Sequence, residues 1–196
     1  FSSKRPIQAG NSEYSFIELT KLPSVGLILL SAAAAMAVFA SVFNFLPYLL
    51  QSAPFNLPVR SATLFYLPYL IGTVAAAFAG RLSNRFSNTF TITLATIGLA
   101  LSLFLMTFPN LIAVGIALLG VCGSFFALHS SMLAVLSRAL STGHGKANAL
   151  YVLFYYMGAW LGVTTAGWIY EHANWNNMIA ALAALLIVPL LLGIKK

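Results

Sequence analysis

The residues best suited to chemistry are the few polar side chains that interrupt long apolar stretches of this sequence. His129, which Ser130 and Ser131 follow, carries an imidazole whose charge changes near neutral pH. Polar groups are costly inside a membrane and tend to face the interior of a helix bundle. His129 therefore has two interpretations: a residue of a polar cavity or proton relay, or a neutral histidine hydrogen-bonded to a neighbouring helix.

An amide and several tyrosines form a second set of candidates. Asn44, close to Tyr48, could contact a small-molecule substrate or could only pack against a neighbouring helix. A tyrosine that is buried in a bundle needs a hydrogen-bond partner for its hydroxyl group. Tyr69, Tyr155 and Tyr156 are therefore candidates for the lining of a polar cavity.

The groups that a catalytic centre needs do not occur together in this sequence. It has no Asp, and of its three Glu only Glu171 lies near the apolar stretches, beside His172. Paired carboxylates, a Ser-His-Asp set and a glycine-rich phosphate loop are missing, and the single Cys122 has no partner at metal-ligand spacing. We predict no enzyme activity, no cofactor and no metal site.

Composition places the chain in a membrane. Of its 196 residues 60% are hydrophobic and only 7% are charged, and the mean hydropathy is +0.91. A soluble domain carries about 25% charged residues. The net charge of +7 does not indicate nucleic acid, because the basic residues lie scattered at the ends of apolar runs. They are typical of membrane-side anchors, so the lipid bilayer is the predicted partner.

Uncharged runs between charged residues predict the individual spans. The run 86–137 exceeds one spanning helix of about 20 residues, and Phe108-Pro109-Asn110 divides it with a turn signal. The sequence predicts an all-α membrane protein with six transmembrane helices at about 24–50, 59–79, 89–107, 110–137, 147–170 and 175–194.

The basic residues also predict an orientation. With the N-terminus inside, nine of the ten Lys and Arg fall in cytoplasmic segments and only Arg60 lies outside. Both termini are then cytoplasmic, and residues Gly80–Asn88, GRLSNRFSN, form a cytoplasmic loop between the second and third helices. Residues 1–23 are predicted to be a cytoplasmic linker, the tail of a central loop, ahead of a bundle of residues 24–196.

Glycines and a short repeat indicate how the helices are arranged. Gly158 and Gly162 are spaced so that two helices can approach closely. Tyr69-Leu-Ile-Gly72 in the second helix and Tyr155-Tyr-Met-Gly158 in the fifth share the pattern Y-x-x-G. The first triplet of helices begins inside and the second triplet begins outside, so the two triplets would be inverted repeats.

Several segments resemble a known family. GRLSNRF at 80–86 resembles the cytoplasmic signature of the major facilitator superfamily, G-x-L-a-D-R-x-G-R-R, although Asn84 replaces the usual Asp and Ser87 the Gly. GSFFALHSS at 123–131 and GKANALYVLFYYMGAWLG at 145–162 resemble the second half of drug and metabolite efflux permeases of the bacterial inner membrane.

The resemblance implies a C-terminal six-helix half, a 3+3 inverted-repeat bundle, whose partner is the N-terminal six-helix half of a twelve-helix transporter. It places Asn44, Tyr48, Phe126 and His129 along a central cavity. A small-molecule substrate would bind near the midplane between the halves, and rocking of the halves would expose it alternately to each side. The expected activity is proton-coupled efflux of small organic or amphipathic compounds, with His129 as the one candidate for a titrating group in this chain.

The resemblance also implies a conformational latch formed by Gly80, Arg81, Asn84 and Arg85. Asn84 can hydrogen-bond but cannot form an ion pair, so this latch would be weaker than that of relatives with Asp. Two alternatives stay open: a non-transporting membrane scaffold or receptor that keeps the fold, and a six-helix protein that homodimerises.

Overall fold

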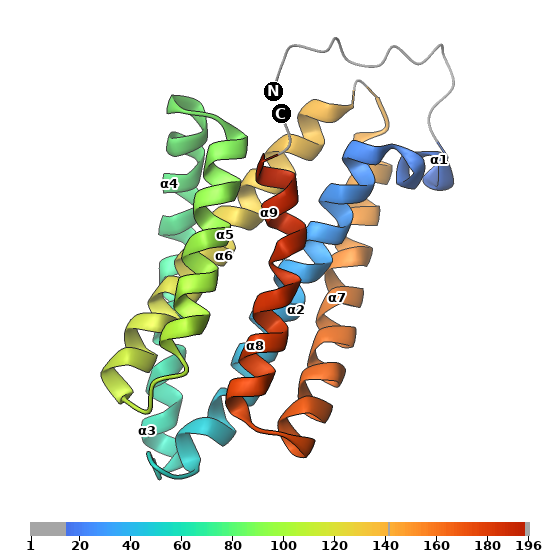
Figure 1. Cartoon of the computed structure of the whole chain (residues 1–196). Coiled ribbons are helices and arrows are strands. Elements are labelled where there is room, and N and C mark those ends of the chain that lie inside the picture. The colour runs from blue at the N-terminus through green and yellow to red at the C-terminus, as the bar shows by residue number, and fades with distance from the viewer. Residues whose placement is uncertain (1–14, 141, 195–196) are drawn as a thin grey trace.

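The computed structural model describes residues 15–140 and 142–194, and every regular element in this part of the chain is a helix (Figure 1). The elements are α1 (Phe16–Lys21), α2 (Pro23–Gln51), α3 (Val59–Thr63), the 3-10 helix η1 (Leu64–Leu70), α4 (Ile71–Arg85), α5 (Asn88–Leu105), α6 (Leu111–Ala139), α7 (His144–His172), α8 (Trp175–Leu185) and α9 (Ile187–Ile194).

Six of the described helical segments are long and apolar enough to cross a membrane, which confirms the predicted all-α membrane fold. Two of these spans are interrupted. The second consists of α3, η1 and α4, with Pro68 inside η1, and the sixth divides into α8 and α9 at Leu186, three residues before Pro189. Proline has no N–H to donate to the carbonyl four residues earlier, so both interruptions have a local cause.

Short polar caps start several of the helices. The side chain of Ser87 accepts a hydrogen bond from the Phe90 N–H at 3.0 Å at the start of α5. Asn110 accepts from the N–H of Ile112 at 2.8 Å at the start of α6, and Asn174 opens α8 in the same way. Such caps satisfy N–H groups that have no partner within the helix, and they allow tight turns between spans.

The segment Gly80–Asn88 is not the loop that the sequence predicts. Helix α4 continues through Gly80 to Arg85, and only Phe86 and Ser87 connect it to α5. Arg85 lies in the last turn of α4, where the negative end of the helix dipole favours a positive charge. The charged residues that suggested a loop therefore belong to a helix that extends beyond the apolar run.

The segment preceding the bundle contains part of its core. Ser15 and Glu18 form a capping box at the start of α1, and hydrogen bonds from the backbone and side chain of Ser15 lower the pKa of the exposed Glu18 carboxyl. Leu19 is fully buried, and α1 packs against α2 and α7. Residues 15–22 of the predicted linker 1–23 are thus part of the folded structure, and its residues 1–14 lie outside the described residues.

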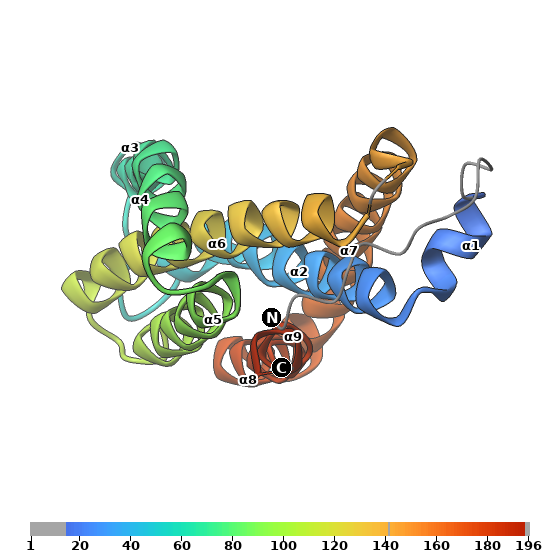
Figure 2. The ribbon, with the colours of Figure 1, turned by 90° about the horizontal axis from the view of Figure 1, so that it is seen from above.

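Seen from above, α2 and α6 run side by side through the middle of the bundle, and α4 and α7 lie at opposite edges (Figure 2). Helix α7 packs on α2, and α4 packs on α6, so each edge helix contacts the first helix of the other triplet. Helices α5 and α9 pack on α6 and α2 in the same crossed manner. These contacts follow the predicted 3+3 arrangement.

The two Y-x-x-G motifs occupy equivalent places in this arrangement. A side chain at Gly72 of α4 would collide with the ring of Phe126 on α6. A side chain at Gly158 of α7 would collide with the backbone of Ala33 on α2. Both glycines therefore lie where an edge helix touches a central helix, and the repeat in the sequence has a packing reason.

Candidate functional site

Aromatic side chains from four elements form one connected cluster. Phe39 of α2 stacks on Phe125 of α6 with ring centroids 4.0 Å apart, and Phe43 lies 4.4 Å from Tyr69 of η1. On the other side, His129 lies 5.3 Å from Tyr155 of α7. The members of this aromatic cluster are Phe39, Phe43, Tyr66, Tyr69, Phe125, Phe126, His129, Tyr151, Tyr155 and Tyr156.

Several rings of the cluster are four residues apart on the same helix. Phe39 and Phe43 are four residues apart on α2, as are Phe125 and His129 on α6 and Tyr151 and Tyr155 on α7. Side chains at this spacing share a helix face. Five of the residues predicted to line a cavity belong to this cluster: Tyr69, Phe126, His129, Tyr155 and Tyr156.

His129 is half-buried and has a specific partner. Its Nδ1 and the Tyr151 hydroxyl share a hydrogen bond of 2.9 Å, and the imidazole lies nearly parallel to the ring of Phe125 at 6.1 Å. Tyr151 is only 1% exposed, so this bond also satisfies a hydroxyl group that water does not reach. His129 is therefore hydrogen-bonded to a neighbouring helix, and its role in a polar cavity or proton relay stays a prediction.

Tyr66 provides a hydrogen bond to a carbonyl of α2 that Pro47 leaves without its helical partner. Pro47 lies inside α2 and has no N–H, so the carbonyl of Phe43 lacks its usual helical partner. The Tyr66 hydroxyl donates a hydrogen bond of 2.9 Å to this carbonyl. Tyr66 and Tyr151 were not predicted as site residues, because each acts through a partner more than twenty positions away in the sequence.

Asn44 and Tyr48 lie apart from the aromatic cluster. They line a separate open groove with Pro47, Gln51 and Ser52 near the end of α2. The Asn44 amide donates to the Ala40 carbonyl of its own helix at 2.8 Å, and Tyr48 is 62% exposed beside Phe45. The structure therefore does not join them with His129 in one site.

The predicted latch residues form the last turns of α4. The guanidinium of Arg81 lies 5.5 Å above the Phe78 ring, and that of Arg85 lies 5.5 Å above Phe86. Gly80 is exposed, and the side chain of Asn84 lies outside the described residues. Among the residues described, no group of three or more metal-binding side chains comes together.

Apolar spans in alternating directions, with an aromatic site between them, define an integral multi-pass membrane protein. The family model of the Major Facilitator Superfamily matches residues 28–195, and the chain belongs to this family. No solved structure gives a significant match.

Curated relatives are named as transporters. An "Uncharacterized transporter" of Buchnera aphidicola subsp. Baizongia pistaciae is 31% identical over 182 residues, covering 90% of this chain and 42% of the relative. One from the Schizaphis graminum subspecies is 24% identical over 89% of this chain and 42% of its own length. "Inner membrane transport protein YnfM" of Escherichia coli is 28% identical over 82% of this chain and 38% of its length. The chain spans about two fifths of these relatives.

Proposed function

We propose that this chain is the C-terminal six-helix half of a secondary active transporter that moves small organic or amphipathic compounds by alternating access, in proton-coupled efflux. The observation that carries the proposal is the aromatic cluster, which collects rings from α2, η1, α6 and α7 around the half-buried His129. Its described members carry no carboxylate or amine. Such a surface suits uncharged or weakly basic compounds that stack on rings.

The edge helices support docking of an N-terminal half. Large apolar side chains of both edges are exposed: Leu67, Leu70 and Val74 on η1 and α4, and Val152, Leu153, Tyr156, Trp160 and Leu161 on α7. Because α4 and α7 lie at opposite edges with α6 between them, a second six-helix unit could contact both at once (Figure 2). The substrate would then lie between this unit and the aromatic cluster.

The charge distribution supports an orientation with both termini in the cytoplasm of a bacterium, in its inner membrane. The ends of α1, α4 and α6 and the start of α7 lie at one end of the bundle, and α3 lies at the opposite end (Figure 1). The first group of helix ends carries Lys21, Arg81, Arg85, Arg138 and Lys146, and α3 carries Arg60. We call the first the basic end. Positively charged residues accumulate on the cytoplasmic side of membrane proteins.

Transport by the full-length protein in inverted membrane vesicles tests this function. Accumulation of compounds from a panel of amphipathic aromatics, lost when the pH gradient is dissipated, is the expected result. Binding without accumulation would instead indicate a receptor or scaffold. A stable homodimer of the six-helix unit with its own transport activity would contradict the two-half architecture.

The last turns of α4 would act as a conformational latch in this transporter. Replacing Asn84 by Asp adds a negative charge close to Arg81 and Arg85 in the sequence, and it should shift the balance between inward-open and outward-open states. The measurement is thiol labelling of cysteines introduced at the end opposite the basic end. Asn84→Gln is the matched uncharged control. Unchanged labelling of Asn84→Asp would show that this segment only connects two helices and is not a latch.

A further inference from the structure

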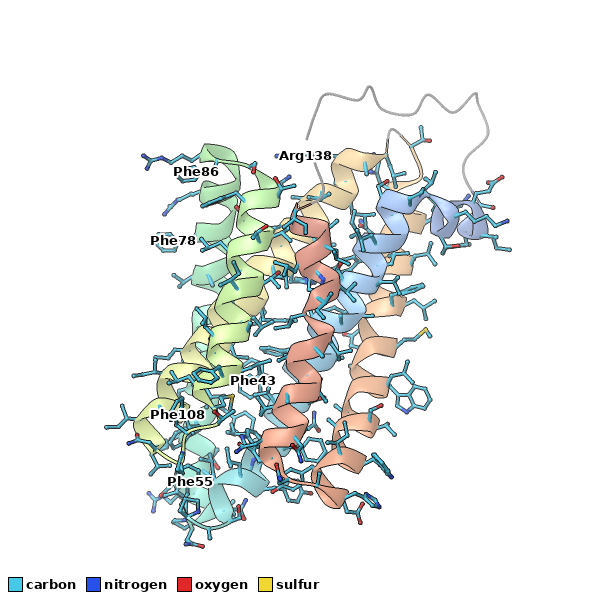
Figure 3. All side chains as sticks on the ribbon, viewed as in Figure 1. Phe43, Phe55, Phe78, Phe86, Phe108 and Arg138 are labelled. Carbon is cyan, nitrogen blue, oxygen red and sulfur yellow. The ribbon has the colours of Figure 1, made fainter. Side chains whose placement is uncertain are left out.

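An open groove of about 590 Å³ runs along the outer side of the bundle near the basic end. Helices α4 and α5 form its walls, with Phe78 and Leu94 among the wall residues, and α6 forms its floor. Figure 3 shows Phe78 and Phe86 pointing outward from this side, at the same end as Arg138. In Figure 2, α4 and α5 lie on one side of the bundle and α7 on the other, and the residues that line this groove include none from α7.

Small residues create the groove. The groove is lined by Ala95 and Gly98 of α5 and by Gly123 and Ala127 of α6. Because these side chains are small, the surface of the groove lies close to the helix backbones. A side chain added at Gly123 would meet nothing within 4 Å, whereas one at Gly98 would collide with the Ser124 hydroxyl. Gly123 therefore borders open space, whereas Gly98 lies against the Ser124 side chain of α6.

Two arginines line this otherwise mostly apolar groove at the basic end. Arg81 and Arg85 are both exposed, and each guanidinium lies over a neighbouring aromatic ring. The described part of the chain has two carboxylates. Glu18 is hydrogen-bonded to Ser15 on α1, and Glu171 lies at the opposite end of the bundle. The positive charge at the groove thus has no carboxylate of the described chain to balance it.

We propose that this groove binds an anionic phospholipid, with one acyl chain against the small residues of α5 and α6 and the phosphate at Arg81 and Arg85. Each part of such a ligand has a counterpart in the groove: the apolar wall residues Phe78 and Leu94 belong to candidate membrane spans, and Arg81 and Arg85 follow the end of the second span at Phe78. Basic pockets between membrane helices bind anionic headgroups in this manner. From Thr91 to Gly98 the groove follows α5 for about 10 Å, which accommodates part of an acyl chain.

Lipid retention tests the proposal without reference to transport. The full-length protein is reconstituted in nanodiscs of equal parts phosphatidylglycerol and phosphatidylcholine, extracted in mild detergent, and the lipids that remain bound are counted by native mass spectrometry. The wild type should retain phosphatidylglycerol preferentially. The double variant Arg81→Gln/Arg85→Gln should reduce this preference about tenfold, since each basic residue near the surface contributes to binding.

A second variant and a matched control distinguish a lipid bound in the groove from non-specific electrostatic attraction of anionic lipids to the basic end. Gly123→Leu fills the groove from a position with free space, and it should displace the bound lipid although both arginines remain. Arg138→Gln/Lys146→Gln removes the same charge from the same end outside the groove, and it should leave the preference unchanged.

Three results would overturn the proposal: an equal loss in the Arg138/Lys146 control, wild-type retention in Gly123→Leu, or crosslinking of Arg85→Cys to the N-terminal half, which would make the groove a protein interface. The arginine pair lies on an exposed surface, so its variant decides the question even if Gly123→Leu does not fold.

Discussion

Replacing Gly158 by leucine should prevent folding of this six-helix unit. A Cβ atom at this position would lie 2.6 Å from the Ala33 carbonyl carbon of α2, and Gly162, one turn later, would bring a Cβ within 2.6 Å of the Ala37 Cα. Backbone atoms cannot move aside as a flexible side chain can, so α7 would separate from α2 along their closest contact. Gly158→Ala alone should lower the free energy of unfolding by about 1–3 kcal/mol.

Thermal unfolding of the full-length protein in detergent, followed by size-exclusion chromatography, measures this effect. Gly145→Ala is the matched control, because it also lies on α7 but a Cβ there meets nothing within 4 Å. This control should be neutral or more stable by up to about 1 kcal/mol, since alanine favours helix over glycine. A Gly158→Leu protein that unfolds at the wild-type temperature would contradict the packing of α7 on α2.

The spans could be predicted because the bilayer imposes length and apolarity on each helix. Residues 24–50, 111–137 and 147–170, which fall in α2, α6 and α7, are mostly apolar and contain no Lys, Arg, Asp or Glu, and Pro109 marks the turn between α5 and α6. The end of α4 could not be found in this way. A helix can continue into the headgroup region, where arginine is favourable, so the loss of apolarity at Gly80 does not mark the end of the helix.

The site could be predicted only in part. The sequence identifies polar and aromatic residues within spans, and five of these gather in the aromatic cluster. It does not contain the rotation of each helix about its axis, which places Asn44 and Tyr48 in a groove of their own. The sequence also does not show which helices pack together near a given residue. This packing brings Tyr151 to His129 and Tyr66 to the Phe43 carbonyl.

Replacing His129 by glutamine should reduce proton-driven transport about tenfold or more and flatten its dependence on pH, if the chain functions as proposed. Histidine is the side chain whose ordinary pKa, about 6.5, allows it to change charge between pH 5 and 8. The groups around it are the hydroxyl of Tyr151 and the rings of Tyr155 and Phe125. Coupling between a proton and a second ligand is typically a 5–150-fold effect. Glutamine keeps a hydrogen-bonding side chain but cannot carry the proton.

The variant Tyr151→Phe distinguishes the effect of proton binding by His129 from the effect of its hydrogen bond to Tyr151. Phenylalanine keeps the ring against His129 and removes only the hydroxyl, which is 2.9 Å from Nδ1. A hydrogen bond between membrane helices contributes about 0.6 kcal/mol, so transport should change threefold or less and should keep its pH dependence. The rates are measured in vesicles at fixed pH gradients over a range of absolute pH. A His129→Gln protein with the wild-type pH profile would show that this histidine serves only to join α6 to α7, and that the coupling proton binds elsewhere.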